Sequence, residues 1–133
     1  MATYNYAPGL GNVGSYQSSG IPWVSSSLVV PHHSATALQV SFPSVTREVT
    51  VRNDSTGDIR VGFSANGIGN TVLTQTNYLI LAENASWTSP VKVTHIYMIS
   101  DSAIAQEATV VAALTGIATD NIIENWTGSA GVG

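Results

Sequence analysis

Apolar and polar residues alternate with a period of two along much of the middle of the chain. The segments 38–42 (LQVSF), 48–52 (EVTVR) and 59–63 (IRVGF) each place apolar side chains at every second position. Because successive side chains of a β-strand point to opposite faces, this alternation is typical of strands with one buried and one exposed face. Turn signals recur about every 8–12 residues, a spacing typical of an all-β sandwich. The pattern therefore predicts about seven to nine short strands between residues 28 and 118.

A cluster of turn-forming residues, NDSTGD at 53–58, separates two of these segments. Asn, Asp and Ser side chains bond to their own backbone, and Gly tolerates positive φ, so such clusters favour turns. We therefore expect a β-hairpin in which the strand ending near Arg52 pairs with the strand beginning at Ile59.

Two later segments give more specific expectations. Residues 78–81 (YLIL) are apolar on both faces, which predicts a strand buried between two layers. The alternation that begins at Val91 changes phase between His95 and Ile99. A β-bulge would absorb the extra residue and restore the inward direction of the side chains.

The two ends of the chain differ from the middle in composition. Residues 1–27 contain four glycines and two prolines, and the first charged residue of the whole chain is Arg47. Gly and Pro disfavour a helix, while a neutral segment with aromatic side chains can lie on a protein surface without desolvating ions. Residues 1–27 are therefore predicted to be an extended N-terminal arm, either a disordered terminus or a segment that lies over its own domain or a neighbour. Residues 119–133 are predicted to be a C-terminal segment and short tail, in which Asp120 could cap a short helix.

Composition excludes several classes of function. The chain has 133 residues, a formal net charge of -4, no cysteine and only 9% charged residues, against a usual figure of about 25%. One domain fits this length, and a disulfide framework or a thiolate site is excluded. Four basic residues are too few to favour nucleic acid as a partner. No apolar run is long enough to span a membrane, and no secretory signal peptide is visible.

Two motifs match functional patterns only in part. GLGNVG at 9–14 spells the dinucleotide-binding G-x-G-x-x-G, but the sequence provides neither the preceding strand nor the following helix, and its first acidic residue is Glu48. The loop that begins at Asn53 resembles an acidic calcium loop, yet its twelfth position is Ser64 rather than the bidentate Glu of an EF-hand. A turn is the better interpretation of this loop.

Catalysis is not expected either. Adjacent histidines on a strand point to opposite faces, so His32 and His33, with His95 as the third histidine, are a poor zinc site. No spacing forces two carboxylates together, and no Gly-x-Ser-x-Gly elbow is present. We therefore expect no catalytic residue, no metal and no cofactor. A small cupin-like enzyme, whose metal these histidines would have to hold, is the alternative.

Aromatic and arginine side chains are the candidates for contacts with a partner. Arg52 and Arg60 could bind an acidic neighbour, or they could pair with Asp54 and Asp58. Tryptophans usually pack in a core or an interface, but Trp23, Trp87 and Trp126 could also form a sugar-stacking platform. The predicted partner-contact residues are Tyr4, Tyr6, Tyr16, Trp23, Arg52, Arg60 and Trp126.

The stretch Leu38–Gly67 (LQVSFPSVTREVTVRNDSTGDIRVGFSANG), with NYLIL and ALTGI further on, resembles small virion proteins built on a single jelly roll. Within this group the sequence resembles the capsid decoration (cement) proteins of tailed bacteriophages and related small jelly-roll capsid proteins. The likeness covers residues 28–118. It consists of the general pattern of residue types along the sequence, the placement of the turns and the size of the domain. It implies a protein that sits on the outer capsid surface as trimers or dimers and clamps neighbouring major capsid subunits through its termini and loops.

These expectations combine into one hypothesis. The chain is expected to be a single antiparallel β-sandwich of jelly-roll type over residues 28–118, with an arm at 1–27 and a tail at 119–133. Its partners would be the major capsid protein and other copies of itself, as a homotrimer or a dimer, on the virion exterior after synthesis in the host cytoplasm. A carbohydrate-binding or receptor-binding module of a virion is the alternative.

Overall fold

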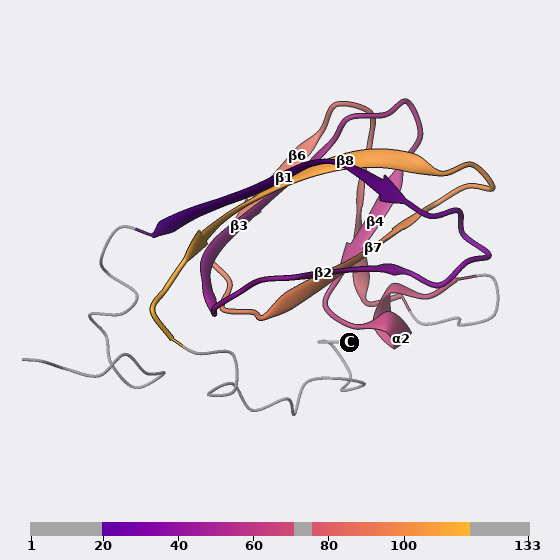
Figure 1. Ribbon diagram of the computed structural model, residues 1–133. Helices are drawn as coiled ribbons and strands as arrows, with labels where there is room; N and C mark the ends of the chain where they lie inside the picture. Colours follow the sequence, from indigo (N-terminus) through magenta and orange to yellow (C-terminus); the bar gives the residue numbers. More distant parts are fainter. Residues whose placement is uncertain (1–19, 71–75, 118–133) are drawn as a thin grey trace, which may run out of the picture.

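The computed structural model describes residues 20–70 and 76–117. This part of the chain forms eight β-strands and one short helix, arranged as two four-stranded antiparallel sheets that enclose a common core (Figure 1). The prediction of an all-β sandwich is confirmed. None of the described helices is long or apolar enough to cross a bilayer.

The two sheets are named here sheet A and sheet B. In spatial order, sheet A consists of β1 (Ile21–Val30), β8 (Gln106–Leu114), β3 (Thr46–Asn53) and β6 (Ser86–Ser89). Sheet B consists of β2 (Leu38–Ser41), β7 (His95–Ser100), β4 (Ile59–Gly62) and β5 (Tyr78–Leu81). The helix α2 (Ala65–Ile68) follows β4.

Strand pairing relates the two halves of the chain. Within the described residues β1 pairs with β8, β2 with β7, β3 with β6, and β4 with β5, all antiparallel. Successive pairs fall alternately in sheet A and sheet B, and the β3–β8 and β4–β7 pairings join them within each sheet. The chain therefore forms one long antiparallel ribbon that is wrapped into two layers.

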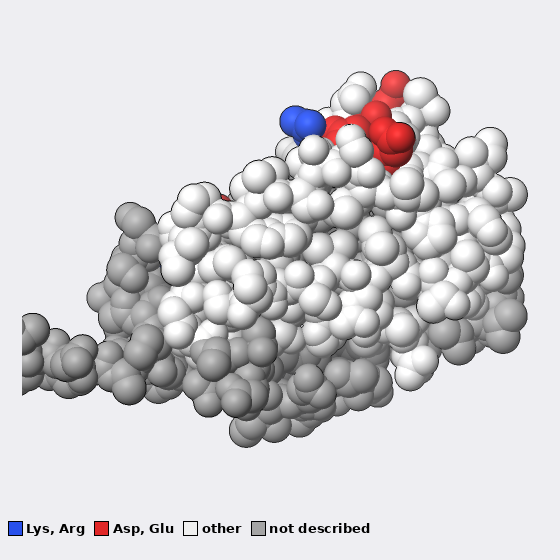
Figure 2. Space-filling model, viewed as in Figure 1, with Lys and Arg blue, Asp and Glu red and all other residues white. Residues whose placement is uncertain are grey.

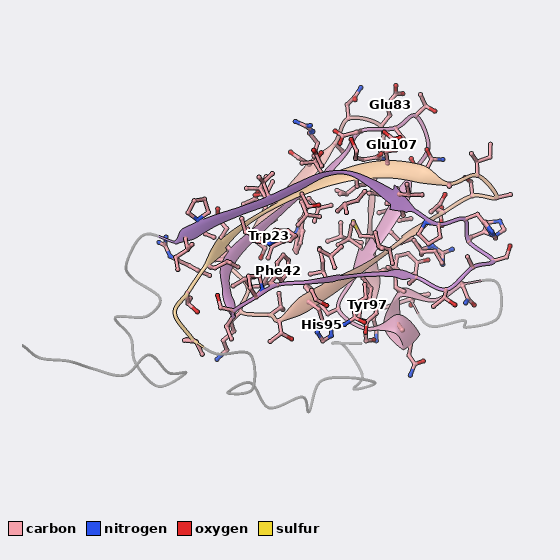
Figure 3. The ribbon with its side chains drawn as sticks, in the orientation of Figure 1. Trp23, Phe42, Glu83, His95, Tyr97 and Glu107 are labelled. Carbon is pink, nitrogen blue, oxygen red and sulfur yellow. The ribbon has the colours of Figure 1, made fainter. Side chains whose placement is uncertain are left out.

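The core lies between the sheets and is made of the alternating apolar residues that the sequence indicates. Each aliphatic side chain removed from water contributes about 1.5–3 kcal/mol. At one side of this core, Trp23 packs edge-on against Phe42, with ring centroids 5.0 Å apart (Figure 3). Fully or nearly fully buried core residues include Val49, Val51, Ile59, Val61, Ile96, Met98, Val110 and Ala112.

The hairpin predicted at residues 53–58 is wrong, because β3 belongs to sheet A and β4 to sheet B. The loop is a crossing between sheets, and the buried side chain of Asn53 holds it in place. Its Nδ2 donates to the carbonyl oxygens of Gly57 at 2.7 Å and Leu81 at 3.0 Å. Its Oδ1 accepts from the backbone N–H of Ser55 at 2.9 Å. The turn-forming residues do make a tight loop, but they do not determine which strand the next segment pairs with.

The sandwich begins before the predicted boundary at residue 28. Strand β1 starts at Ile21 and pairs with β8, so residues 21–27 of the predicted arm belong to sheet A. A register shift between Ser25 and Leu28, with Ser27 at φ 56°, interrupts the alternation and hides this strand from a period-two search. The rest of the arm, residues 1–19, and the predicted segment 119–133 lie outside the described residues.

Two further expectations in sheet B are also wrong. Strand β5 is an edge strand with Ile80 49% exposed, so it is not buried on both faces. Strand β7 pairs in continuous register with β2 and β4, so no bulge lies within residues 95–100; the change of phase falls before Ile96, since Val93, Ile96 and Met98 all lie in the core cluster. The out-of-phase residue Ile99 is fully buried because α2 packs against β4 and β7, with the buried Ile68 close to Gly62 on the outer face of sheet B.

Candidate interaction surface

Charged side chains gather at one end of the sandwich. Backbone hydrogen bonds tie together the loops at this end: His33 N–H to the Ser102 carbonyl, Asp54 N–H to the Glu107 carbonyl, and Asp101 N–H to the Asp58 carbonyl. Figure 2 shows red and blue side chains concentrated there, while nearly all of the remaining described surface in this view is uncharged. The charged residues of this end are Arg52, Asp54, Asp58, Arg60, Glu83, Asp101 and Glu107.

The two candidate arginines lie in different sheets and do not form one basic face. Arg52 pairs with Asp54 at 2.6 Å, as expected, and its side chain is 59% exposed. Arg60 pairs with Asp101 at 2.6 Å rather than with Asp58. Its guanidinium also lies 4.6 Å from the centroid of the Tyr78 ring. The contacts of Arg60 are therefore made within sheet B and the loop after β7, whereas the Arg52 side chain stays accessible to a partner.

Asp54 is the ionisable group most clearly influenced by its neighbours. The Thr109 hydroxyl donates to its Oδ2 at 2.6 Å, and Arg52 Nε donates to its Oδ1 at 2.6 Å. The hydrogen bond from Thr109 first, and then the one from Arg52, lower the pKa of this carboxyl below its usual value. Asp54 therefore stays ionised to lower pH than a free aspartate, and it orients the guanidinium of Arg52.

The two described tryptophans contribute to the core rather than to a sugar-binding platform. Trp87 lies opposite the buried Val51 in the β3–β6 register, with its ring centroid 6.1 Å from that of Phe63. Trp23, on β1, packs against Phe42 instead. Both are partly buried against the core cluster, so each contributes to core packing. Tyr4, Tyr6, Tyr16 and Trp126 lie outside the described residues.

The three histidines are not brought together. His33 lies in the β1–β2 loop, bonded through its backbone to Ser102 beyond the far end of β7, whereas His95 begins β7. The Nδ1 of His95 is 2.9 Å from the Thr94 hydroxyl, and its ring packs edge-on against Tyr97 (Figure 3). Within residues 20–70 and 76–117, no three His, Asp or Glu side chains are grouped so that they could hold a metal ion.

The most distinctive exposed surface was not among the sequence-based candidates. It is the outer face of sheet A, where Val24, Val111, Thr50 and Thr88 are consecutive cross-strand partners on the four strands; we call them the valine–threonine row. Val24 is 66% exposed and Val111 44% exposed. The unbroken apolar run at 110–114 is a signal that could have revealed this row, because it places an apolar residue on the outer face as well as on the inner one.

Comparisons with protein-family models, with curated proteins and with solved structures find no match for this chain.

Proposed function

We propose that this protein is a capsid decoration protein, a jelly roll that binds the outer surface of a viral capsid and stabilises contacts between major capsid subunits. The strand order supports this type of sandwich. Sheets ordered β1-β8-β3-β6 and β2-β7-β4-β5 result when an antiparallel ribbon of eight strands is wrapped into two layers. Eight-stranded, two-sheet jelly rolls recur in viral capsid and lectin domains and in cupins.

One observation carries the functional part of the proposal: the first 46 residues contain no charge, and β1, which lies within this segment, is an edge strand of sheet A. Strand β1 presents Ile21, Val24 and Val29 at 57%, 66% and 64% exposure. An edge of this kind can be covered by another protein without desolvating an ion, which is the main cost of burying charged surface. Exposed apolar patches commonly mark protein interaction sites.

In this role the segments before residue 20 and after residue 117 contact the same partner. Ile21, at the start of β1, is the cross-strand partner of Leu114 at the end of β8. The segments before residue 20 and after residue 117 therefore join the sandwich at one end, away from the charged loops. We propose that they contact the major capsid protein on the virion exterior, with the protein self-associating as a homotrimer or a dimer. No nucleic acid, membrane, cofactor or catalytic activity is needed for this role.

The proposal is tested by removing residues 2–19, which leaves β1 intact, whereas removing 2–27 would delete most of that strand. The truncated protein is expected to keep its cooperative thermal unfolding but to stop co-sedimenting with capsids built from the major capsid protein of its source virus. A full-length variant with Tyr4, Tyr6 and Tyr16 replaced by Ser keeps the length of this segment but lacks its tyrosine rings, and it is also expected to lose capsid binding. Normal capsid binding by both variants would contradict the proposal.

A further inference from the structure

The valine–threonine row crosses sheet A at right angles to its strands and carries no charge. Its two exposed valines, Val24 and Val111, are direct cross-strand partners. The row continues through Thr50 and Thr88, whose hydroxyl oxygens lie 2.8 Å apart. Since these hydroxyls bond to each other, the row presents methyl groups and a satisfied hydroxyl pair to its surroundings, and covering it requires little desolvation.

Opposite charges flank this row symmetrically on β3. Glu48 lies two residues before Thr50 and Arg52 two residues after it, and both are exposed on the same face. At about 3.3 Å per residue, the Cα atom of each charged residue lies about 7 Å from that of Thr50 along the strand. Asp54 accepts a hydrogen bond from Nε–H of Arg52. The remaining N–H groups of the guanidinium can donate to a second carboxylate. A half-turn about the row exchanges the two charged positions, so the pattern is complementary to itself.

We propose that a second copy of this chain packs on the outer face of sheet A, with the two-fold axis of the dimer running along the valine–threonine row. The half-turn places Val24 and Val111 of each copy beside their counterparts. It also brings Glu48 of one copy over Arg52 of the other, twice in each dimer. An isologous interface needs a self-complementary surface of this kind.

Other surfaces of the sandwich are less suited to a second copy. Helix α2 packs on part of the outer face of sheet B, burying Ile68 and Ile99. The long edge strand β1 contains Pro22 and the register shift after Ser25, and both features hinder the addition of a further strand. Face-to-face packing on sheet A is therefore favoured over pairing at its edge.

The expected dimer is reversible. Three spacings of about 4.8 Å separate the outer strands of the face, so the contact is smaller than that of a standard stable interface of about 1,600 Å². The dimer does not depend on the capsid role proposed above, because its face lies within the described sandwich and its formation can be measured in the free protein. Loss of capsid binding on removal of residues 2–19 leaves this inference unaffected.

Sedimentation equilibrium of the full-length protein over a concentration series at low ionic strength tests the apolar part of the interface. Wild type is expected to show a monomer–dimer equilibrium. Val111→Lys is expected to weaken it by about tenfold or more, because it places two unpaired ammonium groups in the contact. Ile104→Lys is the matched control: Ile104 is 71% exposed but lies in the β7–β8 loop, so association should be unchanged. Val111→Thr introduces no charge and keeps a β-branched side chain, so it should weaken the dimer less than Val111→Lys does.

Charge reversal tests the orientation of the two copies. Glu48→Arg and Arg52→Glu are each expected to raise the dimer dissociation constant by about tenfold. The double variant should return to nearly the wild-type value, since the opposite charges again face each other. Thermal unfolding of every variant checks that the sandwich is intact. A wild-type monomer at every concentration, a trimer indifferent to Val111→Lys, or a double variant as weak as the single ones would each overturn the inference.

Discussion

Asn53 offers a sharp test of how the two sheets are joined. The residue is fully buried, and Asn53→Ala removes the hydrogen bonds to Gly57 and Leu81 and the one from Ser55. Each such bond contributes about 1 kcal/mol net, and a buried carbonyl that loses its donor costs more. We therefore expect the free energy of unfolding to fall by about 3–5 kcal/mol, out of a total of about 5–15 kcal/mol. The melting temperature should fall by about 10–20 °C.

Urea unfolding followed by tryptophan fluorescence measures this change. The control is Thr56→Ala, since Thr56 is exposed in the same loop and its replacement should alter stability by less than about 0.5 kcal/mol. Asn53→Asp adds a second readout. Its carboxylate would face two carbonyl oxygens, which raises its pKa in the folded state, so the stability of this variant should decrease as the pH rises. A loss below about 1 kcal/mol in Asn53→Ala would refute the role assigned to this side chain.

Two further predictions concern the candidate surface. Asp54 has a lowered pKa in the folded state, so its contribution to stability is present above its unfolded pKa of about 3.9 and is lost as the pH falls through the folded value. Thr109→Val should therefore be less stable than wild type at neutral pH, with a difference that shrinks on acidification; a constant difference in melts recorded against pH would contradict this. Trp87→Ala should lower stability by about 2–3 kcal/mol through lost packing against Phe63, without changing the binding pattern on a glycan array. Loss of a specific glycan signal in a folded Trp87→Ala protein would instead favour the carbohydrate-binding alternative.

The strands themselves were largely predictable from the sequence. Segments around Val49, Val51, Ile59 and Val61 alternate clearly, and these residues are fully or nearly fully buried in the structure. The reason is local: the period of two follows from strand geometry whichever partner a strand finds. The all-β class and the approximate number of strands depend only on this local information.

The pairing of the strands was not predictable in the same way. The loop 53–58 has good turn residues, and a hairpin is the nearest pairing in sequence, yet β3 pairs with β6 and β8. Those partners lie far along the chain, and the choice between a local and a distant partner depends on how both faces are covered in the finished sandwich. Strand β1 is not apparent from the sequence, because its Ser-rich centre and register shift remove the alternation that indicates the other strands.

The described contact candidates differ in their surroundings. The Arg52 side chain is 59% exposed, and the contact role of the neutral beginning of the chain stays a prediction. Trp23 and Arg60 are instead occupied by Phe42 and Asp101. The valine–threonine row was missed because cross-strand neighbours such as Val24 and Val111 are far apart in sequence, and only the register of sheet A brings them together.

The position of β8 has a consequence for the synthesis of this protein. The last strand of the described residues, β8, is an interior strand that lies between β1 and β3, and the ribosome makes it after the other seven described strands. Until it leaves the exit tunnel, the earlier strands of its sheet have no central partner, and the hydrophobic layer cannot close. The contacts between β8 and the early strands are distant in sequence. Such contacts slow folding and prolong the time for which aggregation-prone intermediates expose apolar surface. Folding of the sandwich is thus expected to be post-translational and cooperative. A polypeptide truncated before residue 106 should aggregate or be degraded rather than form a smaller folded domain.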